Sequence, residues 1–331
     1  MKVSVIIPVY NAENCISNCI KNCKNQTFSD FEVIFVDDCS KDKTTEIISE
    51  KIKNDDHFRL IQLKKNRRQG YARNIGLEHA KGDYVMFFDV DDDYSLNFIE
   101  KMYNKISSDN ADMTACKFCL IDEKSGKTTE NTDFAMLADY PENFHNGFNY
   151  SDITPVIDLF NKSNTIWDKI FRRNFLLENN IKFPTNLFNK EDDVFALRTL
   201  FLAKKITILN KVLYFYKINP EKYNSNFQKQ AIYDCFLMFD LIRNDLQEYG
   251  LLEQFRLDFM KYEIFTLKYY YGMLEQKCHE DFFYKLQNSY KKYEIFSREI
   301  KNSDNVLFEL ITKVLETKEF SPEIDIFLKN Y

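Results

Sequence analysis

Four short apolar runs, separated by stretches with helical periodicity, occupy the N-terminal part of this chain. The runs are Val3–Val9, Phe31–Val36, Phe58–Leu63 and Tyr84–Phe88, and the helical stretches between them are 13–24, 43–53 and 70–80. Buried strands that alternate with helices are typical of a mainly parallel sheet that is covered on both faces. The sequence therefore predicts an α/β fold for this part of the chain.

The rest of the chain divides into a mixed region and a helical region. We expect a helix at 95–106, strands at 112–121 and 206–216, and a hairpin with a loop between 122 and 150. From about residue 229 the spacing of apolar residues is helical. These patterns predict an α/β domain over 1–225, with halves 1–110 and 111–225, and a helical C-terminal subdomain over 226–331.

Charge and hydropathy exclude several classes of protein. The 331 residues carry a formal net charge of −6, whereas a nucleic-acid-binding protein usually presents a basic face. No apolar run approaches the roughly 20 residues that span a bilayer. Because the chain starts with a strand and not with a signal peptide, we expect a cytoplasmic protein.

Eight cysteines raise the question of a metal site. Cys15, Cys19 and Cys23 fall on one stripe of an expected helix, and Cys116 and Cys119 form a single C-x-x-C in a strand-like run. A zinc site of this kind normally needs two such pairs. Buried free thiols are therefore favoured, in agreement with a reducing location.

The fourth apolar run is followed directly by the segment Asp-Val-Asp-Asp at 89–92, which contains the three aspartates Asp89, Asp91 and Asp92. Because buried unpaired charge is costly, we expect them at the exposed carboxyl end of a strand, where open α/β sheets bind ligands. Carboxylate oxygens there suit Mg²⁺ or Mn²⁺, which commonly bridge a carboxylate and a phosphate. From these residues alone, a metal-assisted nucleotide-sugar site and a ligand-free acidic loop are equally good interpretations.

Two other expected strand ends also carry polar side chains. The first strand ends at Tyr10 and Asn11, and the second runs into 37–40, Asp-Asp-Cys-Ser. The sequence contains neither a P-loop nor a G-x-G-x-x-G after the first strand. With only 7 glycines in the chain, a metal and basic side chains must hold any phosphate.

Seven segments of the chain resemble, in the same order, the family 2 glycosyltransferases, which have the GT-A fold. They are Val3–Asn11, Val36–Thr44, Ala72–Leu77, Phe88–Asp92, Ile166–Lys169, Glu191–Asp192 and Tyr214–Lys217. The resemblance spans about residues 1 to 220 and fades in the helical region. It implies an enzyme of bacterial surface-polysaccharide assembly, such as capsule or lipo-oligosaccharide synthesis.

The resemblance assigns the donor site residue by residue. It implies that the nucleotide pocket is lined by Pro8, Tyr10 and Asn11. Asp38 would accept a hydrogen bond from the uracil ring of a UDP-sugar, and Arg73 would approach the nucleotide end of the donor. Asp89 would lie near the ribose and the metal, with Asp91 on the metal that bridges the diphosphate.

The catalytic and acceptor residues also follow from the resemblance. Asp192, in the Glu191–Asp192 pair, would be the general base, although Asp193 competes for this role. Lys217 is a weaker candidate contact for the leaving diphosphate. Trp167 and Lys169 are candidate acceptor contacts, but a core role is favoured for Trp167.

Two positions depart from the family pattern. Cys39 stands where the family usually has Gly after Asp-Asp. The family often has Asn-x-Gly upstream of Ala-Arg-Asn, and here Asn66 is followed by Arg67 and Arg68. A solvated surface charge is favoured for Arg68 over a phosphate contact.

The implied reaction is metal-assisted, inverting transfer of a sugar from a nucleotide-sugar, with UDP as the expected nucleotide and Mn²⁺ or Mg²⁺ as cofactor. The acceptor would be a hydroxyl of a glycan or of a lipid-linked saccharide. Residues 1–110 would bind the donor and residues 111–225 the acceptor. One alternative is a catalytically silent scaffold subunit that binds the nucleotide-sugar. A sugar-1-phosphate nucleotidyltransferase should instead begin with a glycine-rich, basic loop.

The helical region leaves several roles open. It could bind a partner, form a homo-oligomer or rest on the cytoplasmic face of the inner membrane. Lys and aromatic residues are interleaved at 268–271 and 290–293, as in some interfacial helices. Asp and Glu are also frequent there, which favours a soluble packed bundle.

Overall fold

The structure is a computed structural model, and it describes residues 1–122, 124–130, 143–144, 164–218, 225–293, 300–302 and 304–330. It contains two compact units, Met1–Tyr223 and Asn224–Tyr331. The sequence places the corresponding boundary between residues 225 and 226. Most of the loop expected between 122 and 150 lies outside the described residues.

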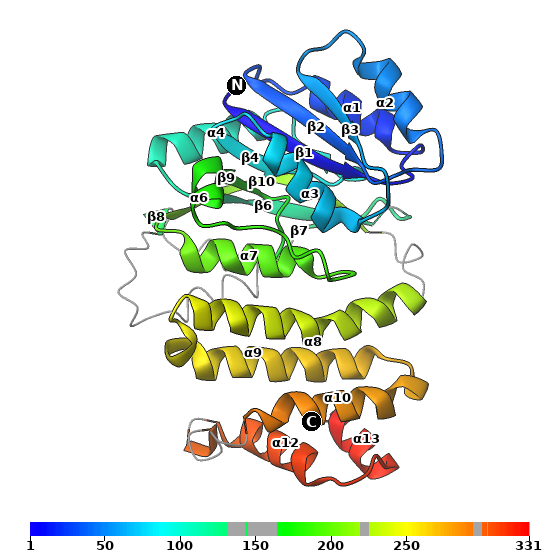
Figure 1. Ribbon diagram of the computed structural model, residues 1–331, viewed down its shortest axis with the longest axis vertical. Coiled ribbons are helices and arrows are strands. Elements are labelled where there is room, and N and C mark those ends of the chain that lie inside the picture. Colours follow the sequence, from blue (N-terminus) through cyan, green and yellow to red (C-terminus); the bar gives the residue numbers. More distant parts are fainter. Residues whose placement is uncertain are drawn as a thin grey trace. The chain divides into compact units, whose positions relative to one another are not determined.

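The first unit is built on one mixed sheet (Figure 1). Its strands are β1 (Val3–Val9), β2 (Phe31–Asp37), β3 (Phe58–Gln62), β4 (Tyr84–Phe87), β5 (Asp93–Tyr94), β6 (Met113–Asp122), β7 (Thr128–Glu130), β8 (Asn143–Phe144), β9 (Lys169–Arg172) and β10 (Ile206–Ile218). The order is β3-β2-β1-β4-β9-β6-β10-β5, with β7 beside β6 and β8 beside β10. Strands β3, β2, β1 and β4 are parallel, as are β6 and β10, whereas β9 is antiparallel to both β4 and β6. The predicted mixed, mainly parallel α/β fold is confirmed.

Helices of this unit follow the expected pattern. They are α1 (Ile16–Lys24), α2 (Thr44–Ile52), α3 (Arg68–His79), α4 (Phe98–Asp109), α6 (Arg173–Glu178) and α7 (Glu191–Leu202). Helix α3 packs on β1 and β2, and a Cβ atom at Gly76 would overlap the side chain of Ile6. This glycine therefore allows α3 to lie close to the sheet and sets the position of the residues that it carries.

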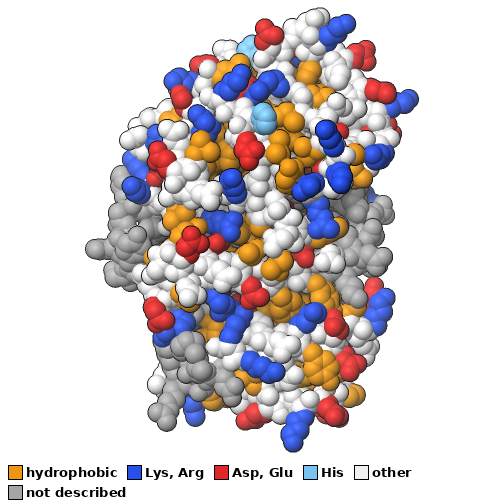
Figure 2. Space-filling view, viewed as in Figure 1, with side chains coloured by type: hydrophobic (Ala, Val, Ile, Leu, Met, Phe, Trp, Pro, Cys, Tyr) orange, Lys and Arg blue, Asp and Glu red, His pale blue; other side chains and the backbone are white. Residues whose placement is uncertain are grey.

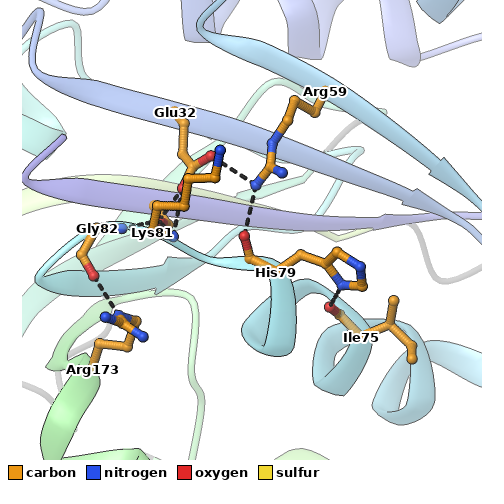
Figure 3. Close-up of polar contacts among 8 residues, drawn as sticks. Glu32, Arg59, Ile75, His79, Lys81, Gly82 and Arg173 are labelled. Carbon is orange, nitrogen blue, oxygen red and sulfur yellow. Dashed lines mark hydrogen bonds and ion pairs between the residues drawn. The ribbon is translucent and has the colours of Figure 1, made fainter.

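The amino end of the sheet is held by a buried carboxylate, Glu32 (Figure 3). It accepts hydrogen bonds from Ser4 Oγ at 2.7 Å and Lys81 N at 2.7 Å, and it pairs with Arg59 Nη2 at 2.8 Å. The same Arg59 nitrogen donates to the carbonyl oxygen of His79, at the end of α3. Glu32 thus joins the start of β2 to the end of α3, and its charge is fully compensated.

The second unit is helical. Its elements are α8 (Ser225–Glu248), α9 (Leu252–Met273), a 3₁₀ turn (Gln276–Cys278), α10 (His279–Lys291), α12 (Asn305–Glu316) and α13 (Pro322–Asn330). Glu263 of α9 is fully buried and accepts hydrogen bonds from Arg243, Ser289 and Tyr293. Within the described residues, no helix combines the length and hydropathy needed to cross a membrane.

The surface and the cysteines complete the description. On the face drawn in Figure 2, Lys and Arg side chains are interspersed with Asp and Glu side chains. All eight cysteines are free thiols, and six are buried. Cys15 is half-buried and precedes α1, so only Cys19 and Cys23 of the expected stripe lie inside the helix.

Candidate active site

The carboxyl ends of β1 and β2 are tied together at one edge of the sheet. Asn11 follows β1 with φ 48°, and its N–H donates to Ser40 Oγ at 2.9 Å. Its side-chain oxygen accepts from Lys41 N at 2.8 Å. The neighbouring Tyr10 is 48% exposed, so its ring is available to a ligand at this edge.

Asp38 joins this edge to the loop that precedes α3. Its two carboxylate oxygens accept the main-chain N–H groups of Arg67, at 2.7 Å, and Arg68, at 2.6 Å. Burial raises the pKa of Asp38, and the two N–H donors oppose that increase. The predicted contact with uracil would therefore add to two hydrogen bonds that the carboxylate already makes.

The departures from the family pattern coincide with left-handed backbone. Cys39 has φ 67° and Arg68 has φ 70°, a conformation that glycine adopts without steric cost. Arg68 is exposed and its guanidinium lies 4.3 Å from the centroid of the Phe188 ring. Both positions thus have a backbone conformation that suits glycine, the residue that the resemblance leads one to expect there.

Replacement of Cys39 by Gly is expected to stabilise the protein slightly. It removes a left-handed penalty of about 1–2 kcal/mol and adds chain entropy to the unfolded state worth about 0.4–1 kcal/mol. The net gain in unfolding free energy is therefore about 0–1.6 kcal/mol, measured by urea denaturation. Lys41→Gly is the control, because Lys41 has no positive φ, and it should destabilise. A loss of stability in Cys39→Gly comparable to that of the control would contradict this account.

Arg73 of α3 connects the acidic strand end to α7. Its side chain is only 2% exposed, and its Nη2 donates to Asp89 Oδ1 at 2.9 Å. Its Nη1 donates to Glu191 Oε1 at 2.7 Å. A buried guanidinium between two carboxylates is compensated on both sides, and this Arg fixes Asp89 relative to the start of α7.

Three acidic residues form the first turn of α7, Glu191, Asp192 and Asp193. Acids are favourable at a helix N-terminus, yet two of these are buried. Burial is the main cause that raises the pKa of Glu191 to about 7, and repulsion from Asp192 is the second. Burial also raises the pKa of Asp193 to about 7, and Asn164 Nδ2 donates to Asp193 at 2.9 Å. Asp192 is the half-buried member of the three.

Asp92 faces away from solvent and towards β10. It is 2% exposed, and it accepts from Tyr214 Oη at 2.8 Å and from Lys217 N at 2.9 Å. Burial and the charge of Asp89 raise the pKa of Asp92 to about 8. Sequence reasoning gave no role to Asp92 or Tyr214, although Tyr214 begins one of the matched segments.

The remaining predicted residues have partners within the fold. Lys217 Nζ lies 2.7 Å from Asp93 Oδ2. Lys169 is 1% exposed, with its Nζ 2.8 Å from Asp168 Oδ1. Trp167 is 5% exposed and stacks on Tyr214 with ring centroids 4.4 Å apart. These contacts favour structural roles for Trp167 and Lys169.

Comparison with known proteins identifies the family. Residues 4–176 match the family model described as glycosyl transferase family 2. Among similar proteins, the cholesterol galactosyltransferase of Borreliella burgdorferi is 30% identical over 274 residues, which cover 82% of this chain and 74% of that protein. The putative glycosyltransferase EpsH of Bacillus subtilis is 28% identical over 258 residues, 77% of this chain and 72% of that protein. The poly(ribitol-phosphate) beta-N-acetylglucosaminyltransferase TarS of Staphylococcus aureus is 30% identical over 228 residues, but these are only 36% of that longer protein.

Solved structures show the same fold. S. aureus TarS 1–349 in complex with UDP-GlcNAc superposes with a TM-score of 0.72 at 22% identity, covering 99% of this chain and 89% of that chain. The mannosyltransferase PcManGT from Pyrobaculum calidifontis, in complex with GDP-Man and Mn²⁺, gives a TM-score of 0.56 at 17% identity, covering 80% and 72%. This chain therefore belongs to glycosyltransferase family 2, and it is a glycosyltransferase with the GT-A fold that acts on a nucleotide-sugar.

Proposed function

We propose that this enzyme transfers a hexose or N-acetylhexosamine from a UDP-sugar to a hydroxyl of a glycan or lipid-linked saccharide, with inversion at the anomeric carbon. The observation that carries the proposal is the position of Arg73. Through one buried guanidinium it joins Asp89, in the D-x-D segment, to Glu191, which directly precedes the proposed base. Donor-binding and proton-accepting groups thus belong to one electrostatic cluster.

The proposed chemistry is a single displacement. Asp192 accepts the proton of the acceptor hydroxyl while that oxygen attacks the anomeric carbon and the bond to the diphosphate breaks. A positioned carboxylate base typically contributes about 10²–10⁴-fold to the rate. Attack opposite the leaving group inverts the anomeric centre.

The same proposal assigns the donor end to the edge formed by β1 and β2. Tyr10 supplies an exposed ring and Asn11 a rigid main chain, beside Pro8 at the end of β1. Asp38 fixes the adjacent loop through its hydrogen bonds to the main-chain N–H groups of Arg67 and Arg68. A UDP-sugar is favoured because the similar TarS structure contains UDP-GlcNAc.

Residues of the acidic segment, Asp89–Asp92, fit a divalent cation. Asp89 and Asp91 offer hard carboxylate oxygens, and one oxygen of Asp89 is held by Arg73. Among the described residues, no three His, Cys, Asp or Glu side chains form a preformed metal cage. Mg²⁺ and Mn²⁺ sites of this class use one or two carboxylates together with water and substrate phosphates, so two aspartates suffice. When bound, the cation would stabilise the charge of the leaving diphosphate as a Lewis acid.

A donor screen tests the proposal. Purified protein is incubated with UDP-GlcNAc, UDP-glucose, UDP-galactose or GDP-mannose, with Mn²⁺, Mg²⁺ or EDTA, and released nucleotide is quantified. We expect release from at least one UDP-sugar that EDTA abolishes, and NMR of the product should show the inverted anomer. Binding of UDP by calorimetry without release from any donor, with saccharide acceptors present, would instead support the scaffold alternative.

A further inference from the structure

Three hydrogen bonds join strand β10 to the acidic segment Asp89–Asp92. The hydroxyl of Tyr214 accepts from the main-chain N–H of Asp89 at 3.4 Å and donates to Asp92 Oδ2 at 2.8 Å. The other oxygen of Asp92 accepts from Lys217 N at 2.9 Å. Both ends of the Asp89–Asp92 segment are therefore bound to the same strand.

Tyr214 is suited to hold another residue in place. It is fully buried, and its ring stacks on Trp167 at an interplanar angle of 17°. A packed aromatic ring has little rotational freedom, so its hydroxyl occupies a fixed position. The Tyr214 hydroxyl is both donor and acceptor here, which uses its hydrogen-bonding capacity in both directions.

The side chain of Asp92 is buried against β10. Its carboxylate is 2% exposed, and each of its oxygens has a partner on β10. Asp91 beside it is half-buried, so adjacent side chains point to different environments. The four-residue segment thus contains one inward carboxylate that anchors it and two, Asp89 and Asp91, that are only half-buried.

We propose that Asp92 and Tyr214 are positioning residues, which fix the main chain of Asp89–Asp92 so that Asp89 and Asp91 can bind the metal and diphosphate, and that Asp92 is not itself a metal ligand. This inference rests on the proposed function. Outer-shell partners of metal ligands typically change metal affinity or activity by about 10–100-fold when they are lost.

The same ring also reaches the segment that supports the base. Trp167, on which Tyr214 stacks, lies three residues after Asn164, whose side chain donates to Asp193 in the first turn of α7. Tyr214 therefore links the acidic segment to the region beside Asp192. We expect loss of the Tyr214 hydroxyl to lower kcat as well as metal affinity. Binding of UDP without metal should change little.

The first test measures the acidic segment without any ligand. Tyr214→Phe keeps the ring and removes the hydroxyl, so amide hydrogen exchange in the peptide containing 89–92 should become faster in EDTA. Tyr94→Phe is the matched control, because Tyr94 is a buried tyrosine of the same aromatic cluster whose hydroxyl contacts Cys23. Unchanged exchange in Tyr214→Phe would overturn the proposal, whatever the enzyme's activity.

The second test separates anchoring from metal ligation. Mn²⁺ binding in the presence of UDP is measured by calorimetry for Tyr214→Phe, Tyr94→Phe, Asp92→Asn and Asp91→Asn. We expect Tyr214→Phe to lose about 10–100-fold and Tyr94→Phe to match the wild type. Asp92→Asn keeps an oxygen for Lys217 N and a polar contact to Tyr214, so its loss should stay below about 10-fold, whereas Asp91→Asn should lose more.

The possible outcomes can be distinguished from failure of the proposed function. If Asp92→Asn is as severe as Asp91→Asn, Asp92 is a ligand and the proposal is wrong. If the wild-type protein binds Mn²⁺ and UDP and releases nucleotide, but Tyr214→Phe equals Tyr94→Phe, only the positioning role is wrong. If the wild-type protein binds no Mn²⁺ with UDP, the proposed function fails and this inference fails with it.

Discussion

Replacement of Asp192 by Asn is expected to lower kcat by about 10²–10⁴-fold, because the acceptor hydroxyl loses the group that takes its proton. The amide keeps the size and hydrogen-bonding shape of the side chain, so donor KM should change little. The measurement is steady-state release of nucleotide with the donor found in the screen.

Asp193→Asn is the matched comparison for this prediction. Asp193 is buried and accepts from Asn164, so it has a supporting position beside the half-buried Asp192. We expect a much smaller effect on kcat than in Asp192→Asn. Normal turnover in Asp192→Asn, together with loss in Asp193→Asn, would transfer the role of base to Asp193.

Replacement of Arg73 by Met is expected to destabilise the protein by about 3–5 kcal/mol, the cost of leaving buried charges without their partner. The guanidinium is 2% exposed and contacts two carboxylates, Asp89 and Glu191. Denaturation in urea or guanidinium measures this loss. Arg67→Met is the control, because Arg67 is exposed, and exposed substitutions usually stay within about 0.5 kcal/mol. Equal stability of the two variants would contradict the structural role of Arg73.

The effect of Arg73→Met should also depend on pH. With Arg73 present, the pKa of Glu191 is already raised from 4.5 to about 7, mainly by burial. Removal of the cation raises this pKa further, so the folded variant binds a proton more tightly than its unfolded chain does. The stability that the variant gains from a protonated Glu191 is fully present below the unfolded pKa near 4.5. This contribution is lost as the pH rises towards the folded pKa, by at most about 1.4 kcal/mol per pH unit for one group. The destabilisation should therefore be smaller at pH 5.5 than at pH 8.

Much of the fold follows from local sequence pattern. Val3–Val9 is predicted and observed as the same strand, because a continuous apolar run of that length suits a sheet covered on both faces. Strand β9 was not predicted. It has only four residues, Lys169–Arg172, and pairs antiparallel between β4 and β6, so its existence depends on tertiary pairing and not on its own periodicity.

In the candidate site, too, some features follow from the local sequence and others depend on tertiary contacts. The acidic segment stands out in the sequence because its charged residues follow an apolar run, and the Glu191–Asp192 pair was found through the family resemblance. The contacts that organise them do not stand out, because Arg73 and Glu191 are 118 residues apart, and Tyr214 and Asp92 are 122 residues apart. Such pairs form only when the sheet brings distant segments together, and no local spacing encodes them.

Strand β9 divides the sheet into two halves. It separates the parallel ladder of β3, β2, β1 and β4 from the parallel pair of β6 and β10, so the two halves of the sheet share no direct ladder with each other. Insertions or exchanges beyond β4 can then alter the second half while the register of the first is preserved. Because β5, β6, β9 and β10 all follow β4 in the chain, the junction of a chimeric enzyme would lie directly after β4.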